Sequence, residues 1–373
     1  MDTTAGEPPG AARARRAPHG PDGHAGGRRR GSGLTDAAGI AVLGCASVWA
    51  LVAAAGRPAR PEGTLLAVLA VTAGYALGRI LGALLPTLAP TAAALTVLAL
   101  VLAPDGRPTA RPEAPPLGYP NADAALLVLA TGAACCAAWT VRSRLRRAAL
   151  RAAGLGAAAA ALALGSAAGF AAGVAVVLCS LAAARLRRRL PALAALALAA
   201  ALAVGTTCAV AVDALPAGLS ASLTGQLTQP RVELWHQAVT LAEDHPLRGV
   251  GPERFAAAIP ADTPGADTYP EVTPAEGPSS ASPQSAPLQL AAEQGVPGVV
   301  LLAVSFGWLL TALWRSPRPT PVVLTAAATL TGLAMLAAVD HVLSYAVVTA
   351  GAGFLAGLAT ARPLAAEQLP PPD

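Results

Sequence analysis

The sequence has few charged and aromatic residues and no lysine. Of its 373 residues, 13% are charged and 3% aromatic, whereas 54% are hydrophobic, and all 26 positions counted as lysine or arginine are arginine. A soluble domain of this length needs more charged side chains than this to cover its surface. The composition therefore excludes an ordinary soluble protein and predicts a protein that crosses a membrane several times.

Sequence signals for nucleotides, metals and cofactors are also missing. There is no Gly-rich loop of the kind that cradles nucleotide phosphates and no acidic cluster that would hold a metal ion. Chemistry on a nucleotide sugar is therefore not expected, and we predict no metal and no cofactor. The formal net charge of +5 indicates no nucleic-acid partner, since many arginines flank apolar segments. The five cysteines lie in apolar segments, where a thiol packs as a small hydrophobic group, so no disulfide is predicted.

Ten apolar segments are long enough to cross a bilayer as helices, which takes about 17 to 25 residues. They cover residues 36–56, 64–85, 87–104, 123–141, 148–164, 166–184, 190–214, 287–314, 320–339 and 342–361. The predicted fold class is all-α, a polytopic integral membrane protein with about ten transmembrane helices, seven in residues 36–214 and three in residues 287–361. Residues 1–35, rich in Pro, Gly and Arg, are predicted to be a disordered cytosolic tail, and residues 362–373 a second tail.

The arginine distribution sets the predicted orientation in the cell membrane. Clusters at Arg142–Arg147, Arg185–Arg189 and Arg315–Pro319 fall on one side if ten spans are counted, and positive loops face the cytosol. Residues 215–286, between the seventh and eighth spans, then form a large extracytoplasmic loop. Four arginines run against this bias, because the same topology places them outside. They are Arg57, Arg60, Arg107 and Arg111.

The loop has its own predicted structure. Apolar residues recur at helical spacing from Arg231 to Ala242, which predicts an amphipathic helix lying along the membrane surface. Pro246, Gly249 and Gly251 follow and favour a tight turn. Residues 283–298 then lead into the next span, so that their polar side chains come to its outer mouth.

Three motifs in this order resemble the O-antigen ligase and O-antigen polymerase-like superfamily. RVELWHQAVTLAEDHPLRGVGPERF begins at Arg231, and SAPLQLAAEQGVPG begins at Ser285 and enters a membrane helix. PLGYPNADAALL, beginning at Pro116, is similar to the Tyr/Phe-Pro-Asn start of an earlier span in that family.

The resemblance implies a metal-independent, inverting glycosyltransferase, either a ligase or a polymerase. Such a protein moves a glycan from a polyprenyl-diphosphate carrier to the hydroxyl of a glycan, lipid or protein acceptor at the outer face of the membrane. Arg231 matches the family's loop arginine and is expected to contact the diphosphate, because a guanidinium is permanently charged. An arginine that only snorkels from an interfacial helix is the alternative. Further residues expected to bind substrate or carrier are Trp235, Arg248, Arg111, Asn121, Gln289 and Glu293.

The sequence departs from the family at two positions. Gln284 stands where the family commonly has histidine, and an amide cannot take a proton at neutral pH. Ala167 stands where a second arginine is usual. Asp340 and His341 are the candidates to replace the missing base, although adjacent residues on a helix would point apart. A non-catalytic membrane protein that binds or transports a lipid-linked glycan is therefore the alternative function.

Overall fold

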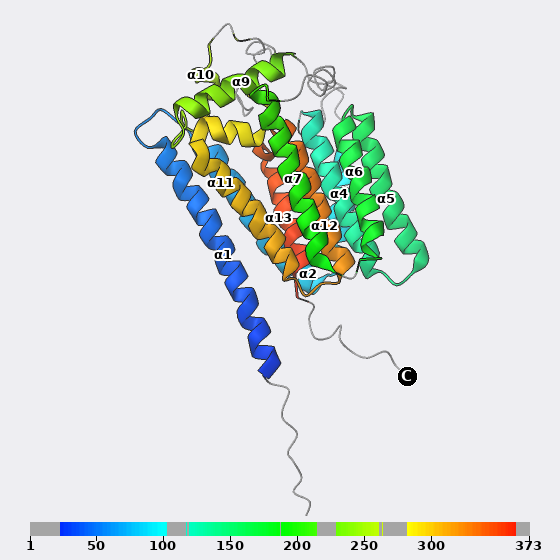
Figure 1. The fold of residues 1–373 in the computed structure, drawn as a ribbon. Helices are drawn as coiled ribbons and strands as arrows, with labels where there is room; N and C mark the ends of the chain where they lie inside the picture. Colours follow the sequence, from blue (N-terminus) through cyan, green and yellow to red (C-terminus); the bar gives the residue numbers. More distant parts are fainter. Residues whose placement is uncertain are drawn as a thin grey trace, which may run out of the picture.

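The computed structural model describes residues 23–102, 117, 119–186, 188–214, 229–260, 263 and 282–362. In this part of the chain all regular structure is helical, which confirms the predicted all-α class. Ten of the helices within these residues stand side by side in one bundle (Figure 1). They are α1 (Gly23–Ala54), α2 (Glu62–Leu84), α3 (Leu88–Leu102), α4 (Pro120–Thr140), α5 (Arg144–Ala163), α6 (Ala167–Ala183), α7 (Arg189–Ala211), α11 (Ala286–Trp314), α12 (Thr320–Val339) and α13 (Ala346–Thr360).

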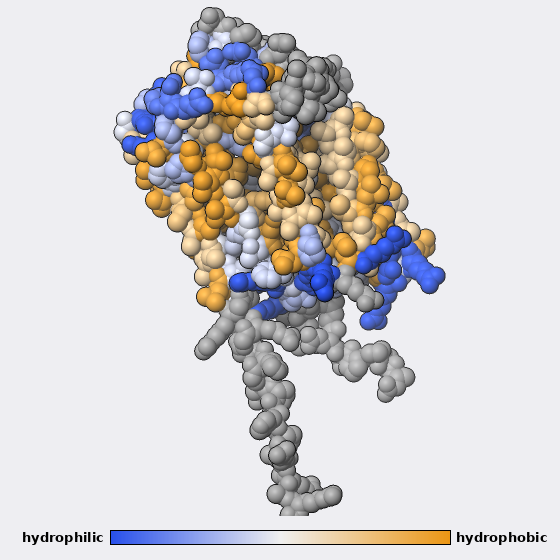
Figure 2. Space-filling model, viewed as in Figure 1, coloured by the Kyte–Doolittle hydropathy of each residue, from blue (hydrophilic) through white to orange (hydrophobic). Residues whose placement is uncertain are grey.

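The lengths and composition of these helices fit a polytopic membrane protein. Six of those described are long and apolar enough to cross a membrane, namely those in α1, α2, α4, α7, α11 and α12, while α3, α6 and α13 are apolar but shorter. α5 has 20 residues, but arginines occupy its first two turns. On the face seen in Figure 2, an apolar belt of side chains lies between two hydrophilic ends. The count of ten spans stays a prediction.

Most helix boundaries differ from the predicted ones by a few residues, and the starts of α1 and α5 have a physical reason. α1 begins at Gly23, so residues 23–35 are helical rather than part of a disordered tail. A formed helix extends at low cost, since each added residue gains a hydrogen bond. α5 begins at Arg144, four residues before the predicted span, because the Ser143 hydroxyl accepts a hydrogen bond from the backbone N–H of Arg146 and caps the helix.

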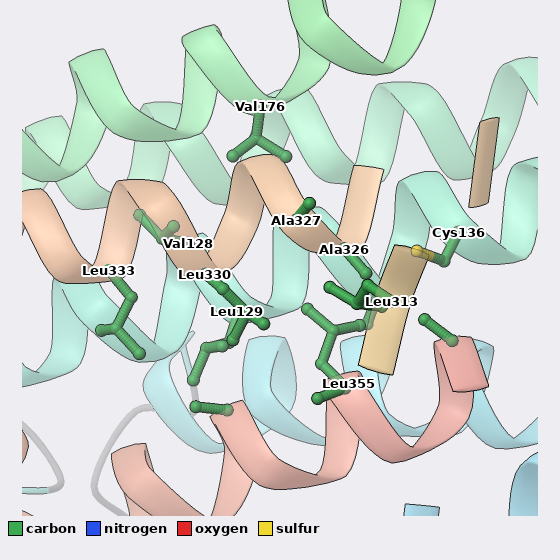
Figure 3. Packing of buried hydrophobic residues seen from close by; sticks show 14 of the residues in the cluster. Val128, Leu129, Cys136, Val176, Leu313, Ala326, Ala327, Leu330, Leu333 and Leu355 are labelled. Atoms are coloured by element: carbon green, nitrogen blue, oxygen red, sulfur yellow. The ribbon is translucent and has the colours of Figure 1, made fainter. Parts of the chain in front are cut away.

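α4 and α12 form the centre of the bundle and are buried on almost all sides, as expected of helices that are apolar all round. Val128 and Leu129 of α4 pack there with Leu330 of α12, Val176 of α6 and Leu355 of α13 (Figure 3). This packing fixes the ends of α4, α12 and α13 relative to one another.

The backbones of α2 and α13 approach each other so closely that a residue with a Cβ would not fit at the points of contact. A Cβ added at Gly74 would lie 2.1 Å from the carbonyl oxygen of Ala350, and one at Gly78 would lie 2.1 Å from that of Phe354. Small residues at such contacts let helix backbones meet, which is a common way of packing helices in membranes. Nearby, Arg79 of α2 pairs with Asp36 of α1 at 3.0 Å, so its charge links two helices.

The two ends of the bundle differ. At one end, here called the arginine end, the guanidinium of Arg189 donates to the carbonyls of Ser316 and Arg318, and Arg315 donates to the Thr35 hydroxyl. The predicted clusters at 185–189 and 315–319 therefore share one end. The helices of the loop, α9 (Gln229–Asp244) and α10 (Phe255–Ala258), cross the opposite end, here called the loop end (Figure 1). Which end faces the cytosol stays a prediction.

Candidate functional site

The site at the loop end is organised by α9, which includes the predicted helix and extends it by two residues at each end. α9 lies across the tops of the bundle helices (Figure 1) and buries Leu234, Trp235 and Ala238. These residues recur at helical spacing and pack with Phe255 and Leu288 in one hydrophobic cluster. The cluster fixes α9 on the start of α11, and Arg231 in its first turn is thereby held over the bundle.

Trp235 holds the segment that carries Gln284. The indole N–H of this buried side chain donates to the carbonyl oxygen of Pro283 at 2.6 Å. The next residue, Gln284, has a φ of 48°, which lies in the left-handed region that is uncommon for residues other than glycine. Such backbone strain persists where surrounding structure enforces it, often at functional sites. Trp235, which was predicted to contact substrate, is therefore a buried side chain that supports the Pro283–Gln284 segment. Gln284 is held in an unusual backbone conformation.

Arg231 and Gln284 contact each other directly. Nε and Nη2 of Arg231 both donate to Oε1 of Gln284, with the Nε contact at 3.0 Å. Two residues that the sequence analysis selected from separate motifs therefore form one unit. This pair of hydrogen bonds orients the planar guanidinium through its Nε–Nη2 edge, and the remaining N–H groups on Nη1 and Nη2 can donate to a phosphate group.

A second polar group forms where α12 ends. α12 stops at Val339, and Asp340 has extended backbone angles. Asp340 and His341 are therefore not neighbours within a helix, and the objection that such neighbours point apart does not apply to them. The Asp340 carboxylate accepts hydrogen bonds from the Tyr119 hydroxyl at 2.9 Å, from the Asn121 amide, and from the backbone N–H of His341 at 2.7 Å. Tyr119 and Asn121 come from the start of α4. An ionised carboxylate is well stabilised by three such donors.

His341 lies against this carboxylate. Its Nδ1 is 3.3 Å from Oδ1 of Asp340 and makes no hydrogen bond within the described residues, so the two form an ion pair only when the imidazole is protonated. The imidazole ring packs on Tyr119, with ring centroids 4.7 Å apart, and Tyr119 in turn stacks on Tyr345 at 6.1 Å. The side chain of His341 is only 11% exposed. Two aromatic rings and a carboxylate therefore define its orientation.

The two polar groups interact through charge. Burial lowers the pKa of His341 below its ordinary value of 6.5, Asp340 opposes this shift, and the positive charge of Arg231 lowers the pKa further. Arg231 is thus close enough to His341 to affect its protonation. At neutral pH the imidazole is the neutral form, which is the form that accepts a proton.

Asp123 lies two residues after Asn121 on α4 and is fully buried. Neither of its carboxyl oxygens has a hydrogen-bond partner among the described residues. Keeping a buried carboxyl group at this position is costly without such a partner. Asp123 and Tyr119 were not among the predicted site residues. Both stand in the PLGYPNADAALL motif, and that motif was the signal in the sequence that could have identified them.

Three other predicted site residues lie apart from this group. Arg248 donates to the carbonyls of Val52 and Ala55 and so caps the end of α1. Gln289 donates to Glu293 at 3.3 Å, and both belong to the first turns of α11. Arg111 lies outside the described residues. The structure thus forms two polar groups at the loop end, one of Arg231 with Gln284 and one of Asn121 with Asp340 and His341, and it adds Tyr119 to the second.

The turn after α9 is built into a break in α11. Gly295 has a φ of 70° and interrupts the helix, and the freed carbonyls of Ala292 and Glu293 accept the backbone N–H groups of Val250 and Gly251, both at 2.9 Å. A Cβ at Gly249 would lie 2.3 Å from the carbonyl carbon of Glu293. The predicted turn therefore requires glycine for close approach as well as for its positive φ.

The comparison with protein families covers much of this region. Residues 152–303 match the family model of O-antigen ligase, and a search of curated proteins found no match. The matched stretch runs from α5 into α11 and includes Arg231 and Gln284, whereas Tyr119, Asp340 and His341 lie outside it. The resemblance stated from the sequence motifs is confirmed, and over these residues the chain is similar to the O-antigen ligase-like superfamily.

Proposed function

We propose that the loop end holds an active site that transfers a glycan from a polyprenyl-diphosphate carrier to an acceptor hydroxyl. The observation that carries the proposal is that the Arg231–Gln284 pair and the Asp340–His341 pair lie at the same end of the bundle, because Val339 at the end of α12 packs against the cluster that holds α9. It combines a cation for a leaving diphosphate with a neutral imidazole for a hydroxyl proton. The acceptor is a glycan, a lipid or a protein, and the resemblance to O-antigen ligase supports a lipid-linked donor.

The reaction follows from these groups. The acceptor oxygen attacks the anomeric carbon, the bond from that carbon to the diphosphate oxygen breaks, and the diphosphate leaves with the bonding electrons. Arg231 stabilises the charge that develops on the leaving group. His341 accepts the proton of the acceptor hydroxyl, and Asp340 stabilises the imidazolium that results. Tyr119 and Asn121 hold the Asp340 carboxylate, so they are positioning residues.

Gln284 takes a different role from the histidine that is common at this position in the family. Its amide oxygen orients Arg231, and an amide cannot act as a base. The proton acceptor is therefore displaced to His341, which lies on another segment of the chain. This division explains how the protein retains chemistry without the family histidine.

The test is transfer by the purified protein in lipid nanodiscs, with a synthetic polyprenyl-diphosphate glycan as donor and no added metal. Arg231→Ala should slow transfer by about 30-fold to 1000-fold, because losing one charge-assisted contact in a transition state costs roughly 2 to 4 kcal/mol. Arg231→Lys should recover little, since it keeps the charge but not the fork. Arg60→Ala, an exposed arginine at the same end, is the matched control. Near-normal transfer by Arg231→Ala contradicts the proposal.

A non-catalytic protein that binds or moves a lipid-linked glycan is the second candidate, favoured by glutamine at position 284. The two functions separate when donor binding and transfer are measured on the same samples. If wild type and Gln284→His both bind donor and neither transfers it, under conditions in which a related ligase is active, the binding function replaces the enzymatic one.

We also propose that the ten long helices span the cell membrane with the loop end outside and both termini in the cytosol. Leu247 at the loop end is 72% exposed and Leu145 at the arginine end is 80% exposed. In a cysteine-free variant in intact cells, an impermeant thiol reagent should label Leu247→Cys and not Leu145→Cys. Permeabilised cells, where both should react, provide the control. The opposite labelling pattern in intact cells would invert the orientation.

A further inference from the structure

A second basic site lies at the loop end, away from Arg231. A cleft of about 340 Å³ is lined by Arg57, His245, Gly249, Val250, Arg254 and Ala258, and we call it the basic cleft. His245 follows the last residue of α9 and Arg231 lies in its first turn, so the two sites are roughly 20 Å apart along the helix axis at 1.5 Å per residue. The basic cleft is therefore not part of the proposed active site.

The charges of the basic cleft are not neutralised by its own lining. None of the lining residues is acidic. Arg57 uses one N–H to donate to the Gly249 carbonyl, and the guanidinium of Arg254 makes no hydrogen bond or ion pair within the described residues. Two arginines from segments almost 200 residues apart are thus held beside each other, and His245 adds a ring nitrogen that can donate. Converging guanidinium groups recognise phosphate.

The position of the cleft indicates a ligand anchored in the membrane. Arg57 lies in the turn that joins α1 to α2, two helices apolar and long enough to cross a membrane. Directly along α1 from this turn, Val48, Leu51 and Val52 are 60%, 51% and 40% exposed. A phosphate in the cleft would therefore have lipid-facing side chains beneath it on which an acyl or prenyl chain can lie. Figure 2 shows the hydrophilic end resting on the apolar belt.

The arginine distribution gives an independent reason. Arg57 is one of the arginines that contradict the positive-inside bias under the proposed topology, and the α1–α2 turn packs on the turn after α9 through Arg57 and Arg248. A positive charge kept on the outer side against this bias is available to bind an anionic group at the level of the lipid phosphates.

We propose that the basic cleft binds the phosphate of a lipid in the outer leaflet. The phosphate has two possible sources with the same chemistry, the headgroup of an ordinary anionic phospholipid or the diphosphate of a second polyprenyl-linked molecule. Arg57 and Arg254 contact its oxygens, and the lipid chain follows the exposed side of α1. This site does not depend on glycan transfer at Arg231.

The experiment measures lipid retention by native mass spectrometry after release from nanodiscs of phosphatidylcholine with added phosphatidylglycerol. Arg254→Gln is the main variant, because its guanidinium makes no hydrogen bond or ion pair within the described residues that the substitution would break. Its affinity for phosphatidylglycerol should fall by about fivefold or more, the effect of one arginine near an anionic surface. Arg60→Gln, an exposed arginine of the same turn that does not line the cleft, should retain the lipid. Arg57→Gln should lose it as well.

Two further arms identify the source and separate this site from the active site. If a synthetic polyprenyl diphosphate displaces phosphatidylglycerol from wild type, and Arg254→Gln weakens its binding, the source is a second lipid-linked molecule. If phosphatidylglycerol is retained against that competitor, the source is a phospholipid. Arg231→Ala should keep the lipid in either case, even if the proposed transfer is absent. Unchanged lipid retention in both Arg57→Gln and Arg254→Gln would overturn the proposal.

Discussion

Replacing Tyr119 by phenylalanine tests the role of the Asp340 carboxylate most directly. The substitution removes one hydroxyl, whose oxygen lies 2.9 Å from Oδ2 of Asp340. The ring that packs on His341 and Tyr345 remains. A hydrogen bond to a charged group contributes about 1.5 to 3 kcal/mol. If the carboxylate must be held in place as the imidazole takes up a proton, this energy is lost from the transition state.

The expected result is a fall in transfer rate of about 10-fold to 150-fold, since each 1.36 kcal/mol corresponds to a factor of ten. The assay is initial-rate transfer from a polyprenyl-diphosphate donor at saturating donor concentration. Tyr345→Phe is the matched control, because it makes the same chemical change in the same stack of rings and its hydroxyl makes no hydrogen bond within the described residues. Thermal unfolding of both variants checks that the bundle is intact. Equal rates for Tyr119→Phe and Tyr345→Phe would refute the role assigned to Asp340.

Three further predictions follow from the same geometry. The transfer rate should fall on the acid side at a pH below 6.5, because burial and Arg231 lower the pKa of His341. Arg231→Gln removes a positive charge, which raises that pKa and should move this acid limb of the pH profile to higher pH. An acid limb that does not move would exclude His341 as the base. Gln284→His should raise transfer and add a titration at about pH 6 to 7 if the absent base limits the rate; a rate below wild type would instead assign Gln284 mainly to holding Arg231. Gly74→Ala should destabilise the protein by about 1 to 3 kcal/mol, because the new Cβ would meet a carbonyl oxygen of α13. Gly156→Ala should not destabilise it, because no atom lies within 4 Å of the new Cβ. Unfolding in mixed detergent micelles measures both effects.

Much of the bundle could be predicted from the sequence, because hydrophobicity over about 20 residues is a local property. The helix at Arg231 and the turn at Gly249 could be predicted for the same reason. The helical spacing of apolar residues and the conformational freedom of glycine are both local properties of a few residues. The extension of α1 to Gly23 was not readable, because the segment has the composition of a tail. Its helix continues from an apolar segment further along the chain.

The candidate site could be predicted only in part. Arg231 and Gln284 were selected from a shared order of motifs, but their contact joins residues 53 positions apart. The hydrogen bond from Asn121 to Asp340 joins residues 219 positions apart and depends on how α4 and α12 pack. Nothing local indicates that Arg248 caps α1 while Arg57 lines a cleft, because both are arginines beside apolar segments. Such roles follow from tertiary contacts.

The break in α11 has a consequence for exchanging loops between related proteins. The turn at Val250 and Gly251 completes its backbone hydrogen bonds with carbonyls that only an interrupted α11 exposes, and Gly295 must approach the backbone of Pro246 and Leu247. A chimera that receives residues 229–260 alone would pair a foreign turn with a helix shaped for another one. Donor segments for altering specificity therefore need to include residues 292–296, so that turn and helix are inherited together.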